Sequence, residues 1–122
     1  MSDSITVNAE IYDWKEKIIY IIKEVEQLDA AKYFLDPVDE IRDDAPRYYD
    51  IIQNPVNIKQ LKSELMNNIT KSPQEFLKKF SLIWMNSFLY NGESHPVSIA
   101  AKRIRSKVMY LWRTKLADNK YN

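Results

Sequence analysis

The chain has 122 residues, enough for one domain with a single hydrophobic core. Apolar residues make up 45% and charged residues 29%, which is typical of a globular protein rather than a disordered one. One glycine, five prolines and no cysteine favour an all-helical fold and exclude disulfides and thiolate zinc sites. The formal net charge of +1 gives no overall attraction to nucleic acid or anionic lipid.

Targeting signals are not visible in the sequence. The longest apolar run, Ile18 to Ile22, is far shorter than the ~20 residues of a membrane-spanning helix. Residues 1–4 lack the basic and apolar segments of a secretory signal. We therefore expect an intracellular domain that does not contact a membrane.

The first helix is predicted over residues 9–28, after an N-terminal extension of residues 1–8. Its apolar residues recur at intervals of three and four, as on one face of an α-helix. This stripe consists of Ile11, Trp14, Ile18, Ile21, Val25 and Leu28.

A long connection follows, from Asp29 to Pro55, in which the helical periodicity fails. Its three prolines restrict the residues before them to extended conformations. Connections of this length are uncommon in compact domains and are usually functional or disordered. This one is too apolar to be left in water, so we predict that it folds back onto the helices and lines a site. Its apolar residues are Phe34, Leu35, Val38, Ile41, Tyr48, Tyr49, Ile51 and Ile52.

Two capping signals mark the next two helices. Asn57 and Gln60 have the spacing of a capping box and begin a short helix that ends at Asn67-Asn68. Its predicted buried stripe is Ile58, Leu61, Leu65 and Ile69. Ser72, with Pro73 and Glu75, begins a third helix. Its stripe is Phe76, Phe80, Ile83 with Trp84, Ser87 and Asn91.

The last long helix begins at Pro96 and ends near Leu116, followed by a polar tail over residues 118–122. Between the third and last helices stands Gly92, the only glycine. The residue before it, Asn91, can cap its helix, or it can offer a hydrogen bond at the mouth of a cavity. Spacing alone leaves both roles open.

Several blocks of the chain, in order and spacing, resemble one family. Phe34 with Asp36-Pro37-Val38-Asp39 is similar to its Phe-x-x-Pro-Val-Asp segment, and residues 46–58 are similar to its Pro-Asp-Tyr-Tyr-x-Ile-Ile-x-x-Pro-Met-Asp-Leu segment. Glu75-Phe76 and the Asn-x-x-x-Tyr-Asn of residues 86–91 match the third helix and its end. The family is the bromodomains, whose members read acetylated lysine. The resemblance covers residues 9–117, which we take as the domain.

The resemblance implies a left-handed four-helix bundle with a pocket at one end, formed by the long first (ZA) loop and the short third (BC) loop. Asn91 would hydrogen-bond the acetyl carbonyl, and Tyr48 would reach the same oxygen through an ordered water. Phe34 would form the floor, and Val97 stands at the gatekeeper position. The implied walls are Val38, Ile41, Ala45 and Tyr90.

The chain departs from the family at the edge of this pocket. Lys32-Tyr33 stands where many members have Trp-Pro, and Asp43 and Ala45 stand where most have apolar residues. Acidic residues predominate around the predicted mouth, which would attract a basic histone tail. They are Asp36, Asp39, Glu40, Asp43, Asp44 and Glu93, against Arg42 and Arg47.

Other classes of function find less support. No phosphate-binding loop, nucleophile with its base or metal-ligand cluster is visible, so we expect no enzymatic activity, cofactor or metal. The basic residues of the last helix spread around the helical wheel, which does not favour nucleic-acid binding. The lone histidine, His95, stands beside a helix start and reads as a capping or solvated residue that could edge the pocket.

Three hypotheses remain. The first is a nuclear reader of acetylated lysine in histone tails, acting in chromatin and transcription regulation. The second is a bromodomain fold that has lost its ligand and serves as an assembly module in a chromatin-associated complex; the Lys32-Tyr33 edge and the Asp43 wall motivate it. The third is a four-helix protein without a pocket, which a cavity between Tyr48 and Asn91 would eliminate.

Overall fold

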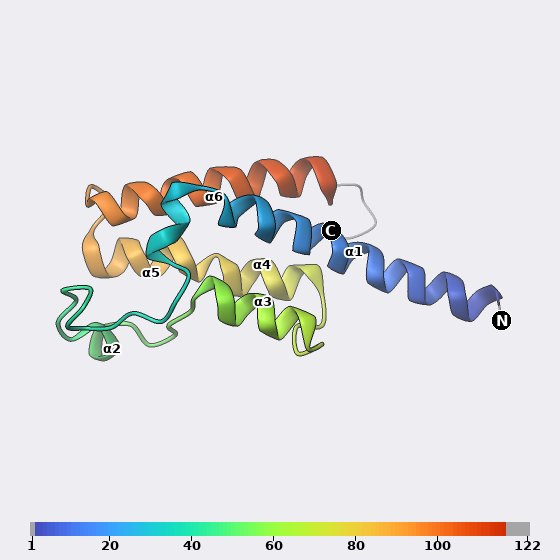
Figure 1. The fold of residues 1–122 in the computed structure, drawn as a ribbon, viewed down its shortest axis with the longest axis horizontal. Helices are drawn as coiled ribbons and strands as arrows, with labels where there is room; N and C mark the ends of the chain where they lie inside the picture. The colour runs from blue at the N-terminus through green and yellow to red at the C-terminus, as the bar shows by residue number, and fades with distance from the viewer. Residues whose placement is uncertain (1, 117–122) are drawn as a thin grey trace.

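The computed structural model describes the backbone of residues 2–116 and the side chains of residues 13–116. Four helical segments run along one another as a bundle, and no β-strand occurs in this described range (Figure 1). They are α1 (Ser2–Glu26), α3 (Ile58–Met66), the nearly continuous pair α4 (Pro73–Phe80) and α5 (Leu82–Asn91), and α6 (Pro96–Lys115). No helix among the described residues is long and apolar enough to cross a membrane. The predicted all-helical four-helix plan is confirmed.

The predicted helix starts are confirmed by their capping hydrogen bonds. The Gln60 amide donates to the Asn57 side chain at 2.9 Å, and the Glu75 amide donates to the Ser72 hydroxyl at 3.1 Å. These bonds satisfy amides that the first turn of a helix leaves without partners. Gly92 ends α5 with φ +81°, a backbone conformation that suits glycine.

Helix ends differ from the sequence-based prediction in three places. The first helix begins at Ser2, so residues 2–8 continue it, and it ends at Glu26 rather than at residue 28. The second helix ends at Met66, where Asn68 adopts φ 61° and turns the chain, so Ile69 is 55% exposed rather than buried. The predicted third helix is interrupted at Ser81, whose hydroxyl donates to the Lys78 carbonyl at 2.7 Å. The predicted tail over residues 118–122 lies outside the described residues.

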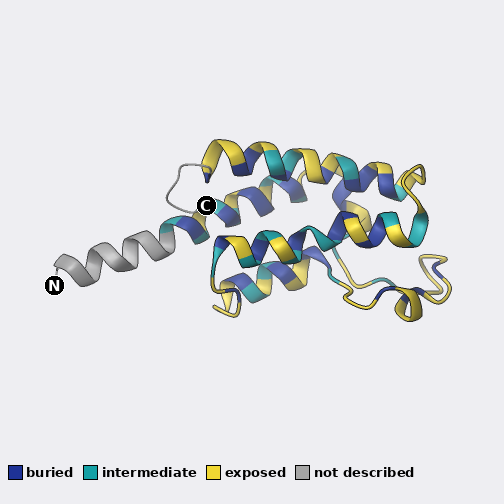
Figure 2. Cartoon of the chain, turned by 180° about the vertical axis from the view of Figure 1, so that it is seen from behind, coloured by how far each residue is buried: buried dark blue, intermediate teal, exposed yellow. Residues whose placement is uncertain are grey.

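The core lies along the axis of the bundle, where all four helical segments contribute buried side chains (Figure 2). Trp14, Trp84 and Trp112 all belong to it, as their positions on the apolar stripes predicted. Burying such side chains is the main stabilising term of the fold, at roughly 1.5–3 kcal/mol for each large apolar group. The described core therefore fixes the directions of the helices that carry the site.

The first connection, residues 27–57, lies at one end of the bundle, and most of its residues between 36 and 55 are exposed (Figure 1). It contains two short elements that the sequence did not predict, the 3₁₀ helix η1 (Asp29–Tyr33) and the single turn α2 (Tyr48–Ile51). Ala30 and Ala31 of η1 are buried against the main core. Ala45, Tyr48 and Ile52 form a second, smaller buried cluster.

The packing predicts that replacing two isoleucines of α6 by alanine lowers the free energy of unfolding by different amounts. Ile104 is fully buried and Ile99 is 48% exposed, both on α6. Ile104→Ala should lower the free energy of unfolding by about 2–5 kcal/mol, because it leaves a cavity. Ile99→Ala, the control, should change it by about 0.5 kcal/mol or less. Urea denaturation followed by circular dichroism measures both, and equal losses would contradict this packing.

Candidate functional site: a cavity at the bundle end

A cavity of about 680 Å³ opens at the end of the bundle, between the first connection, α5 and the start of α6. Seven of the residues that the resemblance implied line it. They are Phe34, Val38, Ala45, Tyr48, Tyr90, Asn91 and Val97. Tyr48 and Asn91 therefore share one cavity, which eliminates the hypothesis of a four-helix protein without a pocket.

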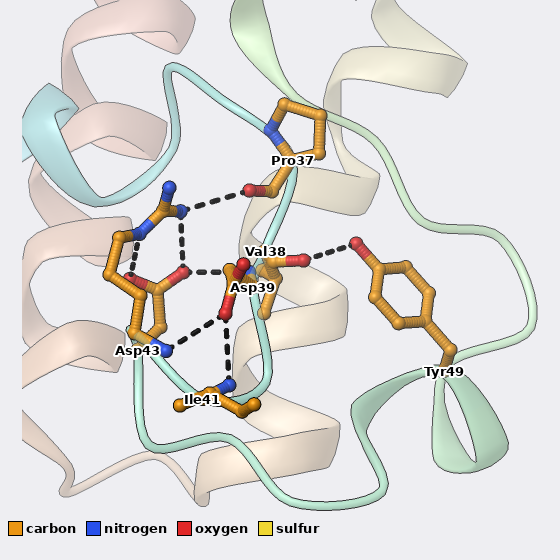
Figure 3. A network of polar contacts seen from close by, with 7 residues as sticks. Pro37, Val38, Asp39, Ile41, Asp43 and Tyr49 are labelled. Atoms are coloured by element: carbon orange, nitrogen blue, oxygen red, sulfur yellow. Dashed lines mark hydrogen bonds and ion pairs between the residues drawn. The ribbon is translucent and has the colours of Figure 1, made fainter.

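Ile41, the eighth implied residue, does not line the cavity and is 93% exposed. The reason is a tight turn that begins at Asp39 (Figure 3). The Asp39 carboxylate accepts from the Ile41 amide at 3.0 Å and from the Arg42 amide at 2.8 Å. This bonding satisfies the amides of the turn and holds Ile41 at its outer tip.

Three tyrosines meet beside the cavity, and only one has a free hydroxyl. The Tyr49 hydroxyl donates to the Val38 carbonyl at 2.5 Å (Figure 3). The Tyr90 hydroxyl donates to the Pro46 carbonyl at 2.7 Å. The Tyr48 ring packs against both others, at centroid distances of 5.3 and 5.1 Å. Within the described residues its hydroxyl has no hydrogen-bond partner, so it remains available on the cavity wall. Burial raises the pKa of Tyr48, and the two neighbouring tyrosines add to the effect.

Asn91 stands on a buried pair of serine hydroxyls. Ser98 donates to the Ser87 carbonyl at 3.1 Å, and the Ser87 and Ser98 hydroxyl oxygens lie 2.9 Å apart. Since the single Ser98 proton goes to the carbonyl, the Ser87 proton must go to the Ser98 oxygen. The Ser87 oxygen then accepts from Asn91 Nδ2 at 3.4 Å. This chain of bonds sets which end of the Asn91 carboxamide is the nitrogen, and leaves one Nδ2 proton and the carbonyl oxygen for the cavity.

Two hydrogen bonds tie the first connection to α5. Asn86, 9% exposed, donates from Nδ2 to the Asn54 carbonyl at 2.9 Å. The Tyr90 bond to Pro46 is the second. Asn54 and Pro46, which precede their partners by 32 and 44 positions in sequence, are thus held against the helix that presents Asn91. Asn86 belongs to the matched motif, but the sequence assigned it no role. The feature that could have indicated one is a polar side chain within the mainly apolar residues 82–90.

Two of the six acidic residues predicted at the mouth, Asp36 and Asp43, form ion pairs. Arg42 makes a two-point contact with Asp43, at 2.9 and 2.8 Å, and this bonding holds the pKa of Asp43 below its usual range. Asp36 pairs with Lys59 at 2.7 Å. Lys32 and Arg42 also line the cavity, so the mouth is less acidic than the sequence suggested. The predicted rim set six acidic residues against Arg42 and Arg47, and the ion pairs of Asp43 and Asp36 partly neutralise it.

His95 also lines the cavity, where its Nδ1 accepts from the Val97 amide at 3.1 Å and caps α6. Both readings of the sequence, a capping residue and an edge of the pocket, hold for it. Among residues 13–116, no group of three or more His, Asp or Glu side chains could hold a metal ion. The cavity offers hydrogen bonding from the neutral side chains of Tyr48 and Asn91 beside apolar residues such as Phe34 and Val38, with charged side chains at its mouth.

Comparison with known proteins identifies the family. The family model described as Bromodomain matches residues 10–103, which is most of the chain. The structure of the bromodomain from human BAZ1A superposes with a TM-score of 0.73 at 22% identity, covering 85% of this chain and 92% of that one. The chain belongs to the bromodomain family.

Among curated relatives, the chain is 32% identical over 103 residues to the SAGA complex subunit Spt7 of Schizosaccharomyces pombe. It is 31% identical over 85 residues to the SWR1 complex bromodomain subunit bdf1 of the same organism. It is 28% identical over 96 residues to Bromodomain-containing factor 2 of Saccharomyces cerevisiae. These matches cover 84%, 70% and 79% of this chain, but only 10%, 15% and 15% of the relatives.

The serine pair predicts a specific loss of stability. Ser98→Ala removes a fully buried hydroxyl and leaves the Ser87 carbonyl without that donor. We expect the free energy of unfolding to fall by about 1–3 kcal/mol, the cost of an unpaired buried polar group. Ser94→Ala, at an exposed position between α5 and α6, is the control and should be neutral. Chemical denaturation measures both; a neutral Ser98→Ala would contradict the described bonding.

The raised pKa of Tyr48 predicts a loss of stability at alkaline pH. The folded protein holds this proton more tightly than the unfolded chain, whose tyrosines titrate near pH ~10. The resulting stability is fully present below about pH 10 and is lost as the pH rises through the folded-state pKa. The free energy of unfolding should therefore fall more steeply above about pH 10 in the wild type than in Tyr48→Phe. Urea denaturation as a function of pH measures both slopes, and parallel slopes would contradict this assignment.

Proposed function

We propose that this bromodomain binds acetylated lysine in its bundle-end cavity. The observation that carries the proposal is the meeting of Asn91 and Tyr48 in one cavity with apolar walls. Asn91 has one Nδ2 proton left after its bond to Ser87, and the Tyr48 hydroxyl has no partner among the described residues. Asn91 donates to the acetyl carbonyl, and Tyr48 reaches the same oxygen through water.

Such a cavity would discriminate by desolvation. Moving a lysine ammonium into an apolar pocket without a counter-charge costs several kcal/mol. Acetylation replaces the ammonium by a neutral amide with a methyl group, which needs one donor and apolar walls. Phe34 and Val38 supply apolar surface, and Asn91 supplies the donor. One neutral hydrogen bond contributes roughly 0.5–1.5 kcal/mol and each buried methyl-sized group ~0.8 kcal/mol, so binding is weak and reversible.

The setting we propose is chromatin in the nucleus. Two relatives are named as a subunit of the SAGA complex and as a bromodomain subunit of the SWR1 complex, which supports a role as a chromatin-associated module and as part of a larger assembly. Histone tails are the proposed source of the acetylated lysine. The module reads a mark without altering it, so we propose no catalytic activity.

The second candidate is a bromodomain that serves assembly alone. The charged wall formed by Lys32, Arg42 and Asp43 favours it, because these residues bring paired charges into a cavity that needs apolar surface. It differs from the first candidate in one testable way. An array of acetylated peptides would give no signal, while the domain would still join its complex.

Titration of an acetylated histone-tail peptide against Asn91→Ala tests the proposal. We expect the affinity to fall by about tenfold or more, since an acetyl carbonyl left without its donor costs roughly 1–3 kcal/mol and 1.4 kcal/mol is a factor of ten. The unacetylated peptide should bind both proteins equally weakly. Isothermal titration calorimetry measures the affinities, and circular dichroism checks that the fold is retained.

Asn67→Ala provides a matched control. Asn67 likewise stands at the end of a helix and donates from Nδ2 to a serine hydroxyl four residues earlier, Ser63, at 3.1 Å, but it is exposed and lies away from the cavity. It should bind the acetylated peptide like the wild type. Acetyl-dependent binding that survives Asn91→Ala would contradict the proposal.

A further inference from the structure

A second hollow lies between Leu28, in the turn after α1, and the exposed face of α6. We call it the α6 groove and define it by Leu28, Ile99, Lys102, Arg103, Lys107 and Tyr110. At ~100° per residue, the five α6 residues fall on one helical stripe, with Ile99 and Tyr110 at its centre. Exposed bands along α6 are visible in Figure 2. The acetyl-lysine site uses none of these side chains.

The centre of the groove is apolar and open to solvent. Ile99 is 48% and Tyr110 57% exposed, and Leu28 is half-buried beneath them. Large apolar side chains that share one hollow at a surface mark sites of interaction more often than isolated ones do. The stripe from Ile99 to Tyr110 spans about 16 Å along the helix axis, which matches roughly three turns of a partner helix.

The rim of the groove is positively charged. Helix α6 carries six Lys and Arg residues and no Asp or Glu. Arg103 and Arg113 make no ion pair among the described residues, and Lys107 approaches Glu24 only at 4.0 Å. Lys102 lies 5.8 Å from the centre of the Phe88 ring, without a carboxylate partner in the described part of the chain. The cations therefore flank the apolar centre with most of their hydrogen-bonding capacity free.

We propose that the α6 groove docks an acidic, amphipathic segment of a partner protein. Apolar side chains of that segment lie on Ile99, Leu28 and Tyr110, and its Asp and Glu residues pair with Lys102, Arg103 and Lys107. Arg103 is the central contact, because it is exposed, unpaired and adjacent to the apolar centre. The groove is thus a second interaction surface, distinct from the acetyl-lysine cavity.

Charge and shape together select this partner over nucleic acid or a second copy. A phosphate backbone would use the cations but has nothing to place on the isoleucine and leucine. In a second copy, the most acidic segment is the first connection. Asp36 and Asp43 are already paired there with Lys59 and Arg42, and the carboxylates of Asp39 and Glu40 accept from backbone amides of the same segment. An acidic amphipathic segment satisfies both the cations and the apolar centre.

The test measures fluorescence anisotropy with a labelled 16-residue helical probe peptide that carries leucines on one face and glutamates on both flanks. We expect saturable binding that Arg103→Glu weakens by about tenfold, as for an arginine at the centre of an interface. Lys78→Glu makes the same change in net charge on the exposed face of α4 and should bind like the wild type. Asn91→Ala should also bind like the wild type, so this result and that of acetylated-peptide binding are independent.

A second readout locates the probe. Amide shifts in ¹⁵N–¹H spectra should change at Ile99, Arg103 and Tyr110 and stay constant at Tyr48 and Asn91. Three further outcomes would overturn the proposal. They are equal binding of a scrambled peptide of the same composition, binding of a DNA duplex but not of the probe, and self-association of the free domain that Arg103→Glu abolishes in sedimentation experiments. Absence of probe binding would overturn it as well.

Discussion

The site depends on the attachment of the first connection to α5. Asn86 and Tyr90 hold two distant points of that connection through backbone carbonyls, and Asn91, the residue after Tyr90, lines the cavity. One helix therefore places both the wall and the hydrogen-bond donor. Because Asn86 is buried, its loss would leave the Asn54 carbonyl without this partner, which costs more than the bond itself contributes.

The side chains around Asn91 and Tyr48 are held in place by neutral groups rather than by ion pairs. The serine pair beneath Asn91 is buried, and the ring packing of Tyr48, Tyr49 and Tyr90 stabilises the wall beside it. Neutral hydrogen bonds in a dry environment keep their geometry without the desolvation cost of an ion pair. The charged residues that line the cavity lie at its mouth, where pairs such as Arg42 and Asp43 are exposed to water that screens them. This separation suits a cavity for a neutral, acylated side chain.

Local patterns predicted the helices and much of the cavity, because capping residues and apolar stripes act over a few positions. Asn57, Ser72 and Gly92 start or end helices as their types suggested. The burial of two residues was predicted wrongly, for a different reason. Ile69 and Ile41 are apolar and were expected to be covered, but backbone turns at Asn68 and Asp39 direct them into solvent. The turn at Asp39 depends on side-chain to backbone bonds, and the turn at Asn68 depends on a left-handed backbone conformation; hydrophobic periodicity records neither.

Contacts between segments distant in sequence could not be predicted either. The Asn86 bond to Asn54 and the pairing of Ser87 with Ser98 join segments whose proximity only the fold creates. The same is true of charge: residues that look like an acidic rim in sequence acquire the partners Arg42 and Lys59 in space. The α6 groove likewise includes Leu28, which is distant from α6 in sequence and meets it only in the folded structure.

The most direct test of the account is the side-chain amide signal of Asn91 in ¹⁵N–¹H spectra during titration with an acetyl-lysine peptide. The account predicts that one Nδ2 proton shifts and saturates with the acetylated peptide and does not respond to the unacetylated one. An Asn91 signal that stays unchanged while acetylated peptide binds would contradict it, because the ligand would then use another surface.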